Sequence, residues 1–414
     1  MKRRIVFVIN YFYPDFASTG QLMTTLCLHL QNEFDITVIA AQPDNVEDDL
    51  EKRTKLFTKD MLEGVQIIRI RMPAVDKTNK FSRMKYISTY FLLALFVVLR
   101  QRRTNIIYTI SSPPIIGGLI GTIGKVLKRA KHVYNIQDFN PEQAEAVSFL
   151  KQSWVFRVAK WIDNWNCKMA DHIVTVGRDM QETLTNRFSG RNGKIPSNTV
   201  INNWAEENEI VPLPKEHPNV ERFLAANNLK GKFIIMYSGN LGLYYDLENI
   251  IQLTSRFKDH PDIAFVFIGD GAVKDRMKQF VLREKIENVL FLPFQPKEYI
   301  KYSLNAADVH LVVNQKGIKG VSVPSKIYGV MASGKPILGV LESGSEACRL
   351  IVDSNSGVVV EPRDYDGIYA AIMMLYNMGE HHLQAAGLQG RRYLESNLKK
   401  EISLEKYRYL LQSL

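Results

Sequence analysis

The chain has 414 residues, 46% of them hydrophobic and 23% charged, a balance typical of a globular protein and not of a disordered or fibrous one. Its length exceeds the usual size of one domain, so two domains are expected. The formal net charge of +10 suits an anionic partner, and the three cysteines lie too far apart for a metal-binding motif or a disulfide framework.

Apolar runs typical of buried strands alternate with helical patterns along the first half of the chain. The first run, Ile5–Ile9, has five residues, too few for the core of a signal peptide. This short run and the separated cysteines predict a cytoplasmic protein. Because helical patterns separate the strands, a parallel sheet is expected. The expected strands are Arg4–Asn10, Ile36–Ala40, Val65–Arg71, Asn105–Ile110, His132–Gln137, His172–Val176 and Thr199–Asn202.

The first expected strand leads into a turn that places Ser18, Thr19 and Gly20 at the start of a helix. A glycine lets a ligand come close to the backbone, and a helix N-terminus favours an anion. Thr19 and Gly20 are therefore candidate ligand contacts. The alternative is that Ser18 or Thr19 simply caps the helix.

A basic stretch without Asp or Glu extends from Lys77 to Lys131. Its eleven cations exceed the formal net charge of +10, so the rest of the chain is close to neutral. Inside it, Tyr86–Leu99 forms fourteen consecutive uncharged residues. That length is below the roughly 20 apolar residues that a membrane-spanning helix needs. The cations are Lys77, Lys80, Arg83, Lys85, Arg100, Arg102, Arg103, Lys125, Lys128, Arg129 and Lys131.

Two structures suit the Tyr86–Leu99 segment: a helix buried in the core, and a helix lying on an anionic membrane surface. We expect a helix that packs on its domain with one side and faces lipid with the other. A nucleic-acid-binding patch is less favoured, because the aromatic residues alternate with aliphatic ones and not with Arg or Lys. The expected membrane contacts are Lys85, Phe91, Leu92, Phe96, Arg100, Arg102, Arg103, Lys128 and Arg129.

Asp138 and Glu142 follow the strand expected at His132–Gln137. Asp138 is expected at the carboxyl end of that strand, and Glu142 one helical turn later. Carboxylates in such positions orient a sugar hydroxyl or act as a base. Capping of the next helix by Asp138 or Asn140 is the simpler alternative.

Residues 204–218 are rich in proline and acidic residues and lack apolar periodicity, which predicts a linker. Two doubly wound α/β domains are expected on either side, at residues 1–203 and 219–390. A C-terminal helix at residues 391–414 is expected to pack back toward the first domain. The strands expected in the second half are Phe233–Ser238, Ala264–Ile268, Val289–Leu292, Val309–Val313, Ile337–Val340 and Gly357–Val360.

Glycines follow the first two of these strands: Gly239 and Gly242 after one, Gly269 and Gly271 after the next. Such turns suit contact with phosphate or sugar, or are only tight turns. The chain has neither the GxxxxGK[ST] phosphate loop nor a GxGxxG motif after its first strand. This argues against an ordinary NTPase and against a dinucleotide-dependent dehydrogenase.

The segment Val321–Pro336 predicts a loop, a short helix and a Gly-Lys-Pro turn into the strand Ile337–Val340. Pro324 suits the first turn of the helix, and Ser325 and Lys326 then lie at its N-terminus. A cation there, after a strand, suits the phosphates of a nucleotide. An ordinary loop–helix–strand unit is the alternative.

An ordered set of these motifs covers nearly the whole chain and resembles a known family, although no single motif is decisive. It resembles the bacterial branch of retaining glycosyltransferase family 4, which has the two-domain B fold. More narrowly, it is similar to the L-fucosamine and colanic-acid transferases of O-antigen and capsule assembly. The set is the N-terminal Ser-Thr-Gly loop with Gln137–Glu142, Ile201–Trp204, Tyr237–Gly242, Phe267–Gly271, Val323–Tyr328, Met331–Pro336 and Asn355–Pro362.

The resemblance implies two Rossmann-like domains that face each other across a cleft. It implies that residues 219–390 bind a nucleotide sugar, most often a UDP-sugar, and that residues 1–203 bind an undecaprenyl-diphosphate-linked saccharide at an anionic membrane surface. It implies transfer with retention and without a metal or other cofactor, because cations and helix ends stabilise the departing diphosphate. The expected location is the cytoplasm, peripherally attached to the inner face of the plasma membrane, with no nucleic-acid partner.

The chain departs from the family pattern at four positions. Many members carry two glutamates where this chain has Val321 and Gly329. Many also carry an Arg and a Lys where it has Asn240 and Tyr245. Lys326 is therefore expected to bind the donor diphosphate.

The resemblance and the turns together give a set of candidate site residues. Asp138 and Lys326 are the expected catalytic residues, and Asp138 and Glu142 the expected contacts to acceptor or sugar. Glu346 is expected to hold the sugar or ribose, or else only to favour the dipole of its helix. The expected donor contacts are Thr19, Gly20, Gly239, Asn240, Gly242, Gly269, Pro293, Phe294, Ser325, Lys326 and Glu346.

These features predict a retaining glycosyltransferase that moves a sugar, expected to be an N-acetylated amino sugar, from a UDP-sugar to a lipid-linked saccharide. The product would belong to an O-antigen, a capsule or an exopolysaccharide. One alternative is an isomerase of the same fold, similar to UDP-N-acetylglucosamine 2-epimerase, which needs no acceptor. The other is a catalytically inactive, membrane-attached binding protein, which the two missing glutamates keep open.

Overall fold

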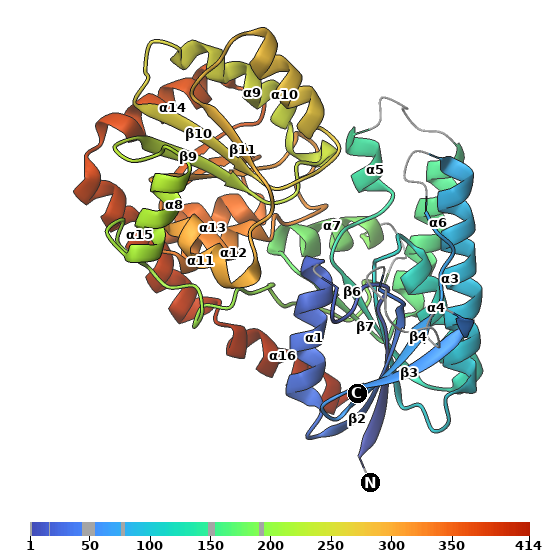
Figure 1. The fold of residues 1–414 in the computed structure, drawn as a ribbon. Helices are drawn as coiled ribbons and strands as arrows, with labels where there is room; N and C mark the ends of the chain where they lie inside the picture. Colours follow the sequence, from blue (N-terminus) through green and yellow to red (C-terminus); the bar gives the residue numbers. More distant parts are fainter. Residues whose placement is uncertain (1, 16, 44–53, 76–78, 148–153, 190–193) are drawn as a thin grey trace. The chain divides into compact units, whose positions relative to one another are not determined.

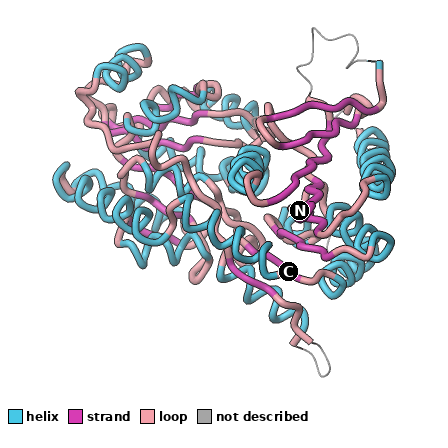
Figure 2. Tube along the Cα trace, turned by 90° about the horizontal axis from the view of Figure 1, so that it is seen from below, coloured by secondary structure: helices cyan, strands magenta, loops and turns pink. Residues whose placement is uncertain are grey.

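The computed structural model describes residues 2–15, 17–43, 54–75, 79–147, 154–189 and 194–414. The chain divides into two compact units, each built around its own sheet (Figure 1). The first unit comprises residues 1–145, 150–201 and 404–414, and the second comprises residues 146–149 and 202–403. Figure 2 shows helices on both sides of the strands.

The first unit holds an eight-stranded sheet in the order β3-β4-β2-β1-β5-β6-β7-β8 within its described residues. The seven strands expected from the sequence are present, and their ends differ from the expected ones by at most two residues. The strands are β1 (Arg3–Val8), β2 (Phe34–Ala41), β3 (Phe57–Leu62), β4 (Val65–Ile70), β5 (Ile106–Ile110), β6 (Lys131–Ile136), β7 (His172–Thr175) and β8 (Asn198–Val200).

The edge strand β3 contradicts the expectation of a purely parallel sheet. It pairs antiparallel with β4, whereas every other pair in this sheet is parallel. None of its side chains is fully buried, and polar residues such as Thr58 and Asp60 interrupt its apolar ones. An edge strand of this kind lacks the continuous apolar run by which buried parallel strands are recognised.

Helices cover both faces of the first sheet. The helices α3, α4 and α6 lie side by side on one face, and α1 and α16 lie on the other (Figure 1). The helices with described residues in this unit are α1 (Ser18–Leu30), α3 (Lys80–Arg100), α4 (Ile116–Lys128), α5 (Glu142–Val147), α6 (Trp154–Met169), α7 (Arg178–Phe188) and the end of α16 (Lys400–Ser413).

Helix α4 approaches the sheet closely because glycines form its inner face. A Cβ atom at Gly117 would lie 1.9 Å from the carbonyl oxygen of Ile110, and one at Gly121 would lie 2.0 Å from Nε2 of His132. The His132 ring is fully buried and its Nε2 lies 2.8 Å from Oγ1 of Thr109. Burial lowers the pKa of His132 to about 3, so the ring is neutral at physiological pH.

The end of the chain completes the core of the first unit. Tyr407 of α16 is fully buried, and its hydroxyl accepts a hydrogen bond of 2.9 Å from Nδ2 of Asn135 in β6. The same amide donates to the hydroxyl of Tyr108 in β5 at 2.6 Å. Arg3 of β1 donates to the carbonyl oxygens of Leu411 and Gln412. Both ends of the described chain therefore contribute to one sheet and its cover.

The second unit has six strands, all parallel, in the order β11-β10-β9-β12-β13-β14. Five of them have the expected bounds, and β10 begins one residue earlier than expected. Each is mostly apolar, with His310 inside β12 and Ser238 at the end of β9, as expected for strands covered on both faces. The strands are β9 (Phe233–Ser238), β10 (Ile263–Ile268), β11 (Val289–Leu292), β12 (Val309–Val313), β13 (Ile337–Val340) and β14 (Gly357–Val360).

Residues 201–217, which include most of the expected linker, hold no helix or strand. The helices of the second unit begin at Pro218. They are α8 (Pro218–Ala226), α9 (Leu247–Leu253), α10 (Lys274–Arg283), α11 (Lys297–Asn305), α12 (Lys326–Ala332), α13 (Glu346–Ser354), α14 (Tyr365–Asn377), α15 (Glu380–Asn397) and the first residues of α16, with short 3₁₀ turns at Leu243–Tyr245 and Thr254–Phe257.

Each sheet has one point at which the direction of strand addition reverses. In the first sheet β1 lies between β2 and β5, and in the second β9 lies between β10 and β12. In doubly wound sheets, ligands bind outside the carboxyl ends of the strands at such a switch point. One site is therefore expected at the turns after β1 and β5 in the first unit, and one at the turns after β9 and β12 in the second.

Replacing Gly121 with Ala should destabilise the first unit by about 1–3 kcal/mol, because the new Cβ overlaps the His132 ring. At a helix position with free space the same change would stabilise by about 1 kcal/mol, so the sign itself is diagnostic. Urea unfolding measures the change in the free energy of unfolding. Val126→Ala, at an exposed position of the same helix, should change stability by no more than about 0.5 kcal/mol and serves as the control.

Candidate functional site

The ammonium group of Lys326 lies between two tyrosine rings of the second unit. Its Nζ is 4.1 Å from the ring centroid of Tyr237 and 4.0 Å from that of Tyr245. It also donates a hydrogen bond of 2.7 Å to the Tyr237 hydroxyl. Tyr237 belongs to β9 and Tyr245 to the 3₁₀ turn after it, so the cation lies at the switch point of this sheet.

Helix α12 presents this lysine. It begins at Lys326, directly after Ser325, so Pro324 precedes the helix and does not lie in its first turn as the sequence predicted. The exposed Ser325 makes no side-chain capping bond. Lys326 is half-buried, and burial lowers the pKa of its ammonium group to about 7. Because desolvation disfavours the charged form, an anionic ligand that arrived here would restore it.

Close backbone contacts between two glycine turns form the floor beside Lys326. Gly239 and Gly269 have φ values of +142° and +139°, which favour glycine. A Cβ atom at Gly269 would lie 2.0 Å from the carbonyl oxygen of Gly239, and one at Gly239 would lie 3.3 Å from Cε of Lys326. The exposed ring of Phe294, after β11, is the next neighbour of Gly269. Gly239, Gly269, Phe294 and Lys326 are thus brought together.

The other expected donor contacts of this unit are placed differently. Asn240 is exposed, and its carbonyl accepts a hydrogen bond of 2.7 Å from the Tyr237 hydroxyl. Gly242 is buried, and Pro293 is exposed beside Phe294. Glu346 is buried at the start of α13, where Asn202 donates to its Oε1 at 3.0 Å.

In the first unit, Thr19 and Gly20 lie in the first turn of α1. The residue before this helix is Ala17, and no side chain caps it, so the capping alternative for Ser18 or Thr19 is wrong. Gly20 is required by space, since a Cβ there would lie 3.0 Å from the carbonyl oxygen of Tyr11. Both residues follow β1, at the switch point of the first sheet.

Asp138 lies just beyond the carboxyl end of β6, as expected, and is half-buried. Its backbone N–H donates to Oγ of Ser111 at 3.1 Å, which ties the turn after β6 to the turn after β5. Among the described residues, no group of three or more His, Cys, Asp or Glu side chains is arranged to hold a metal ion.

The carboxylate of Glu142 is engaged by two cations. Its Oε2 lies 2.6 Å from Arg187 and its Oε1 lies 3.1 Å from Lys160. Burial opposes ionisation of Glu142, but the two cations outweigh it and lower its pKa. Arg187 also binds the buried Asp163 at 2.7 Å and stacks on the Phe139 ring at 4.1 Å. Glu142 therefore belongs to a buried ion-pair network that fastens α5 and α6 to α7.

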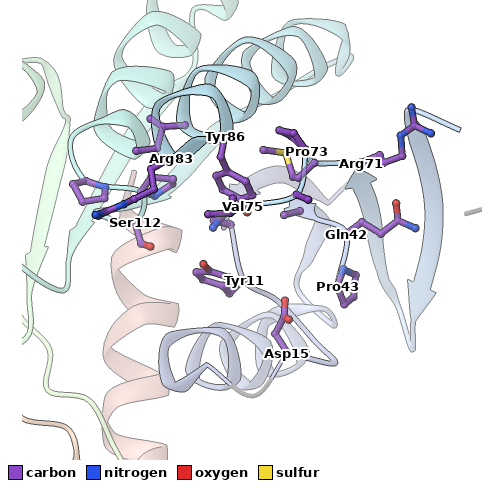
Figure 3. A pocket seen from close by; sticks show the side chains of 17 residues that line it. Tyr11, Asp15, Gln42, Pro43, Arg71, Pro73, Val75, Arg83, Tyr86 and Ser112 are labelled. Atoms are coloured by element: carbon purple, nitrogen blue, oxygen red, sulfur yellow. The ribbon is translucent and has the colours of Figure 1, made fainter. Parts of the chain in front are cut away.

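A cavity of about 640 Å³ opens at the carboxyl ends of β1, β2, β4 and β5 (Figure 3). Tyr11 and Asp15 come from the turn after β1, and Arg83 and Tyr86 come from the first turns of α3. The Tyr86 hydroxyl donates to Oδ1 of Asn10 at 3.1 Å. The guanidinium group of Arg83 has no hydrogen bond or ion pair within the described residues. The sequence did not indicate these lining residues, because their elements are distant in the chain.

Helix α3 is longer than the apolar segment that signalled it. It spans 21 residues. By length and composition alone, Phe81–Arg100 is long and apolar enough to cross a membrane. In the structure, 22% of its apolar 18-residue window is buried. One side packs inward through Tyr90 and Ala94, while Leu92 and Phe96 are 63% and 45% exposed. Of the expected membrane contacts, Phe91 is half-buried against the core.

The remaining expected membrane contacts are basic and lie near the ends of α3 and α4. Lys85 and Arg100 are exposed on α3, and Arg102 and Arg103 follow it. Lys128 donates to the carbonyl oxygen of Leu99 at 3.1 Å, which joins the end of α4 to the end of α3. Arg129 ends α4 in the left-handed conformation with φ of +53°.

Both halves of the chain match models of glycosyltransferase families. Residues 21–203 match the glycosyl transferase 4-like domain, and residues 219–389 match glycosyl transferases group 1. The probable glycosyltransferase WbjE of Pseudomonas aeruginosa is 30% identical over 342 residues, which covers 81% of this chain and 82% of the relative. The putative colanic acid biosynthesis glycosyl transferase WcaI of Escherichia coli K12 is 23% identical and covers 97% and 98%.

Solved structures share the fold. Sucrose-phosphate synthase from Thermosynechococcus elongatus superimposes with a TM-score of 0.76 over 100% of both chains at 15% identity. Anabaena HepE, solved in complex with UDP and glucose, gives a TM-score of 0.71 over 99% of both chains at 14% identity. These matches confirm the two-domain α/β fold of B-type glycosyltransferases that the sequence predicted.

Replacing Arg187 with Ala should destabilise the first unit by about 3–5 kcal/mol, because the buried Asp163 and the half-buried Glu142 lose their shared cation. Chemical denaturation measures the loss. Lys160→Ala removes the exposed partner of the same carboxylate and should cost no more than about 1 kcal/mol. Equal losses in the two variants would contradict the role given to the buried network.

Proposed function

The chain belongs to the bacterial glycosyltransferases with two B-type domains, and from this premise we propose that it is a retaining enzyme of polysaccharide assembly. Its donor is a UDP-sugar, expected to carry an N-acetylated amino sugar. Its acceptor is an undecaprenyl-diphosphate-linked saccharide of an O-antigen, capsule or exopolysaccharide. The name of the Escherichia coli relative, which refers to colanic acid, and the UDP bound to Anabaena HepE support this choice.

The observation that carries the proposal is the cation of Lys326 at the switch point of the second sheet. The bond between the anomeric carbon and the diphosphate breaks during transfer, and negative charge accumulates on the leaving UDP. A fixed cation aimed at that charge stabilises the transition state more than the ground state. The two tyrosine rings hold the ammonium group in place before the donor arrives, so little reorganisation is needed.

The neighbours of Lys326 suit the rest of a nucleotide sugar. Gly239 and Gly269 carry no side chain, so a phosphate or sugar can come close to the backbone there, while their own N–H groups donate to the carbonyl oxygens of Ile268 and Leu292. The exposed Phe294 offers a flat apolar face for the base. No metal or other cofactor is required in this scheme, since Lys326 supplies the positive charge.

The cavity of the first unit suits the acceptor. Tyr11 and Tyr86 offer ring faces to a sugar, and Arg83 offers its guanidinium group to a phosphate. Asp138, at the end of a neighbouring strand, is proposed to orient the attacking hydroxyl. The exposed apolar face and the flanking cations of α3 suit the inner surface of the plasma membrane, where a lipid-linked acceptor resides.

A donor screen tests the proposed reaction. The purified protein is incubated with UDP-, GDP- and dTDP-sugars and a polyprenyl-diphosphate-linked saccharide, and products are read by mass. A product heavier by one sugar, formed only from UDP-sugars, supports the proposal. A changed nucleotide sugar without acceptor would instead indicate the isomerase, and no turnover of any donor despite UDP binding would indicate an inactive binding protein.

Lys326→Ala should lower the turnover number by about 10²- to 10³-fold, because one preorganised charge on the leaving group is lost. The matched control is Lys230→Ala, which removes an exposed lysine of the same unit that pairs with the exposed Glu221. Initial rates at saturating donor measure the effect. Unchanged turnover in Lys326→Ala would show that another group stabilises the departing diphosphate.

Donor binding should weaken as the pH rises through about 7, because only the protonated Lys326 attracts the diphosphate. UDP-N-acetylglucosamine is a suitable probe, since its diphosphate keeps its charge over this range. Titration calorimetry at about pH 6 and about pH 8 should show roughly tenfold weaker binding at the higher pH. Lys326→Arg keeps its charge and should bind with little pH dependence. A parent protein whose affinity does not vary would contradict the assignment.

A further inference from the structure

The fully buried side chains of helix α6 are polar ones and a cysteine. The face that packs on the first unit carries Asp163, Asn166 and Cys167, all buried. Asp163 accepts a hydrogen bond of 3.0 Å from the Tyr134 hydroxyl and binds Arg187 at 2.7 Å. Asn166 accepts a hydrogen bond of 3.2 Å from Thr122 of α4. A polar network, and not an apolar stripe, therefore attaches this helix.

The outward face of α6 is aromatic. Trp154, Trp161 and Trp165 are 69%, 68% and 39% exposed, and Val155 and Val158 are 52% and 45% exposed. The positions 154, 158, 161 and 165 follow helical spacing, so these side chains form one stripe. A surface helix of a soluble domain normally has the reverse arrangement. We define Trp154, Val155, Val158, Trp161 and Trp165 as the tryptophan face.

The two helices next to α6 in the row also carry exposed apolar side chains. On α4, which contacts both α6 and α3, Val126 and Leu127 are 57% and 61% exposed. On α3, Leu92 and Phe96 are likewise exposed. Large exposed apolar side chains gathered on neighbouring helices mark a site of contact with a membrane or another protein.

The charges on these three helices favour one partner. Helices α3, α4 and α6 carry a single acidic residue, Asp163, and it is buried. Arg157 and Lys168 are exposed beside the tryptophans, and Lys85 and Arg100 are exposed on α3. Exposed cations, with no exposed carboxylate on these described helices, complement an anionic bilayer. Tryptophan is also the residue that favours the level of the lipid headgroups, where its ring is buried and its N–H stays hydrated.

We propose that the tryptophan face of α6 docks this protein on an anionic lipid bilayer, with the helix lying in the plane of the headgroups. The described part of α6 carries Arg157, Lys160, Asp163 and Lys168, more charge than a membrane-spanning helix tolerates. The sequence predicted lipid contacts on α3 and at the end of α4, but none on α6. The proposed contact through α6 is therefore an additional one. The inference rests on the proposed function only for its biological setting, because lipid binding is measurable without sugar transfer.

The tryptophans themselves report the docking. The chain has four, and the fourth, Trp204, is only 6% exposed, so a change in intrinsic fluorescence on adding lipid comes from α6. The full chain is mixed with vesicles of phosphatidylglycerol and phosphatidylcholine, and with vesicles of phosphatidylcholine alone. A blue shift with the anionic vesicles, and quenching by lipids brominated near the headgroup end of the acyl chain, is the expected result.

A variant with Trp154, Trp161 and Trp165 all changed to Ser tests the face directly. Its partitioning onto anionic vesicles, measured by flotation, should fall at least about tenfold, because three interfacial side chains are lost. The variant should still unfold cooperatively in urea, because Trp154 and Trp161 are mostly exposed and only Trp165, 39% exposed, packs substantially on the domain. Trp204→Phe is the control and should float like the parent. Unchanged flotation of the triple variant, or a parent fluorescence that does not respond to lipid, would overturn the proposal.

Two further measurements distinguish lipid docking from self-association and from a failure of the proposed reaction. If sedimentation without lipid shows a dimer of the parent that the triple variant loses, the face joins two copies and the lipid proposal is wrong. Transfer to a water-soluble, short-chain acceptor should be equal in the parent and the triple variant. If neither transfers sugar while the parent binds vesicles and the triple variant does not, the proposed function fails and the docking proposal stands.

Discussion

Parallel strands impose the constraint on which both units depend. Since every pair but the β3–β4 edge runs parallel, each strand delivers its following turn to the same edge of its sheet. At the switch point these turns must share a small space, and glycine makes that possible: the turn after β10 touches the backbone of the turn after β9. The long side chain of Lys326 then crosses this floor and ends between two rings. The proposed chemistry thus follows from the packing of the backbone.

The first unit shows how tight packing in one place exposes apolar surface in another. The glycine face of α4 brings that helix down on the sheet, and Asn166 of α6 bonds to the same helix. Asp163 and Arg187 complete a polar attachment that uses up the inner face of α6. The large tryptophan rings then have no place inside. A buried ion pair adds little net stability but fixes orientation, and here it fixes which side of α6 faces outward.

The sequence predicted the strands of the second unit well, because each is a short, mostly apolar run separated from the next by a helical pattern. It missed β3, whose polar edge pattern has no such signal. It placed Ser325 and Lys326 correctly at a helix start, but not the rings around the cation, since Tyr237 lies 89 positions away. In the sequence, Tyr245 was considered only as a position at which many family members carry a cation. The stripe at 154, 158, 161 and 165 was visible in the sequence, yet such spacing ordinarily marks a buried face.

The return of residues 404–414 to the first unit has a consequence for biosynthesis. Tyr407 fills the core beside Tyr108, and Arg3 of β1 bonds to the carbonyl oxygens of Leu411 and Gln412. On a ribosome, the first unit emerges early but cannot close its core until the whole second unit has been translated. Of this C-terminal helix, the second unit includes only the first residues, up to Ser403. The unit that begins synthesis first is therefore the one completed last.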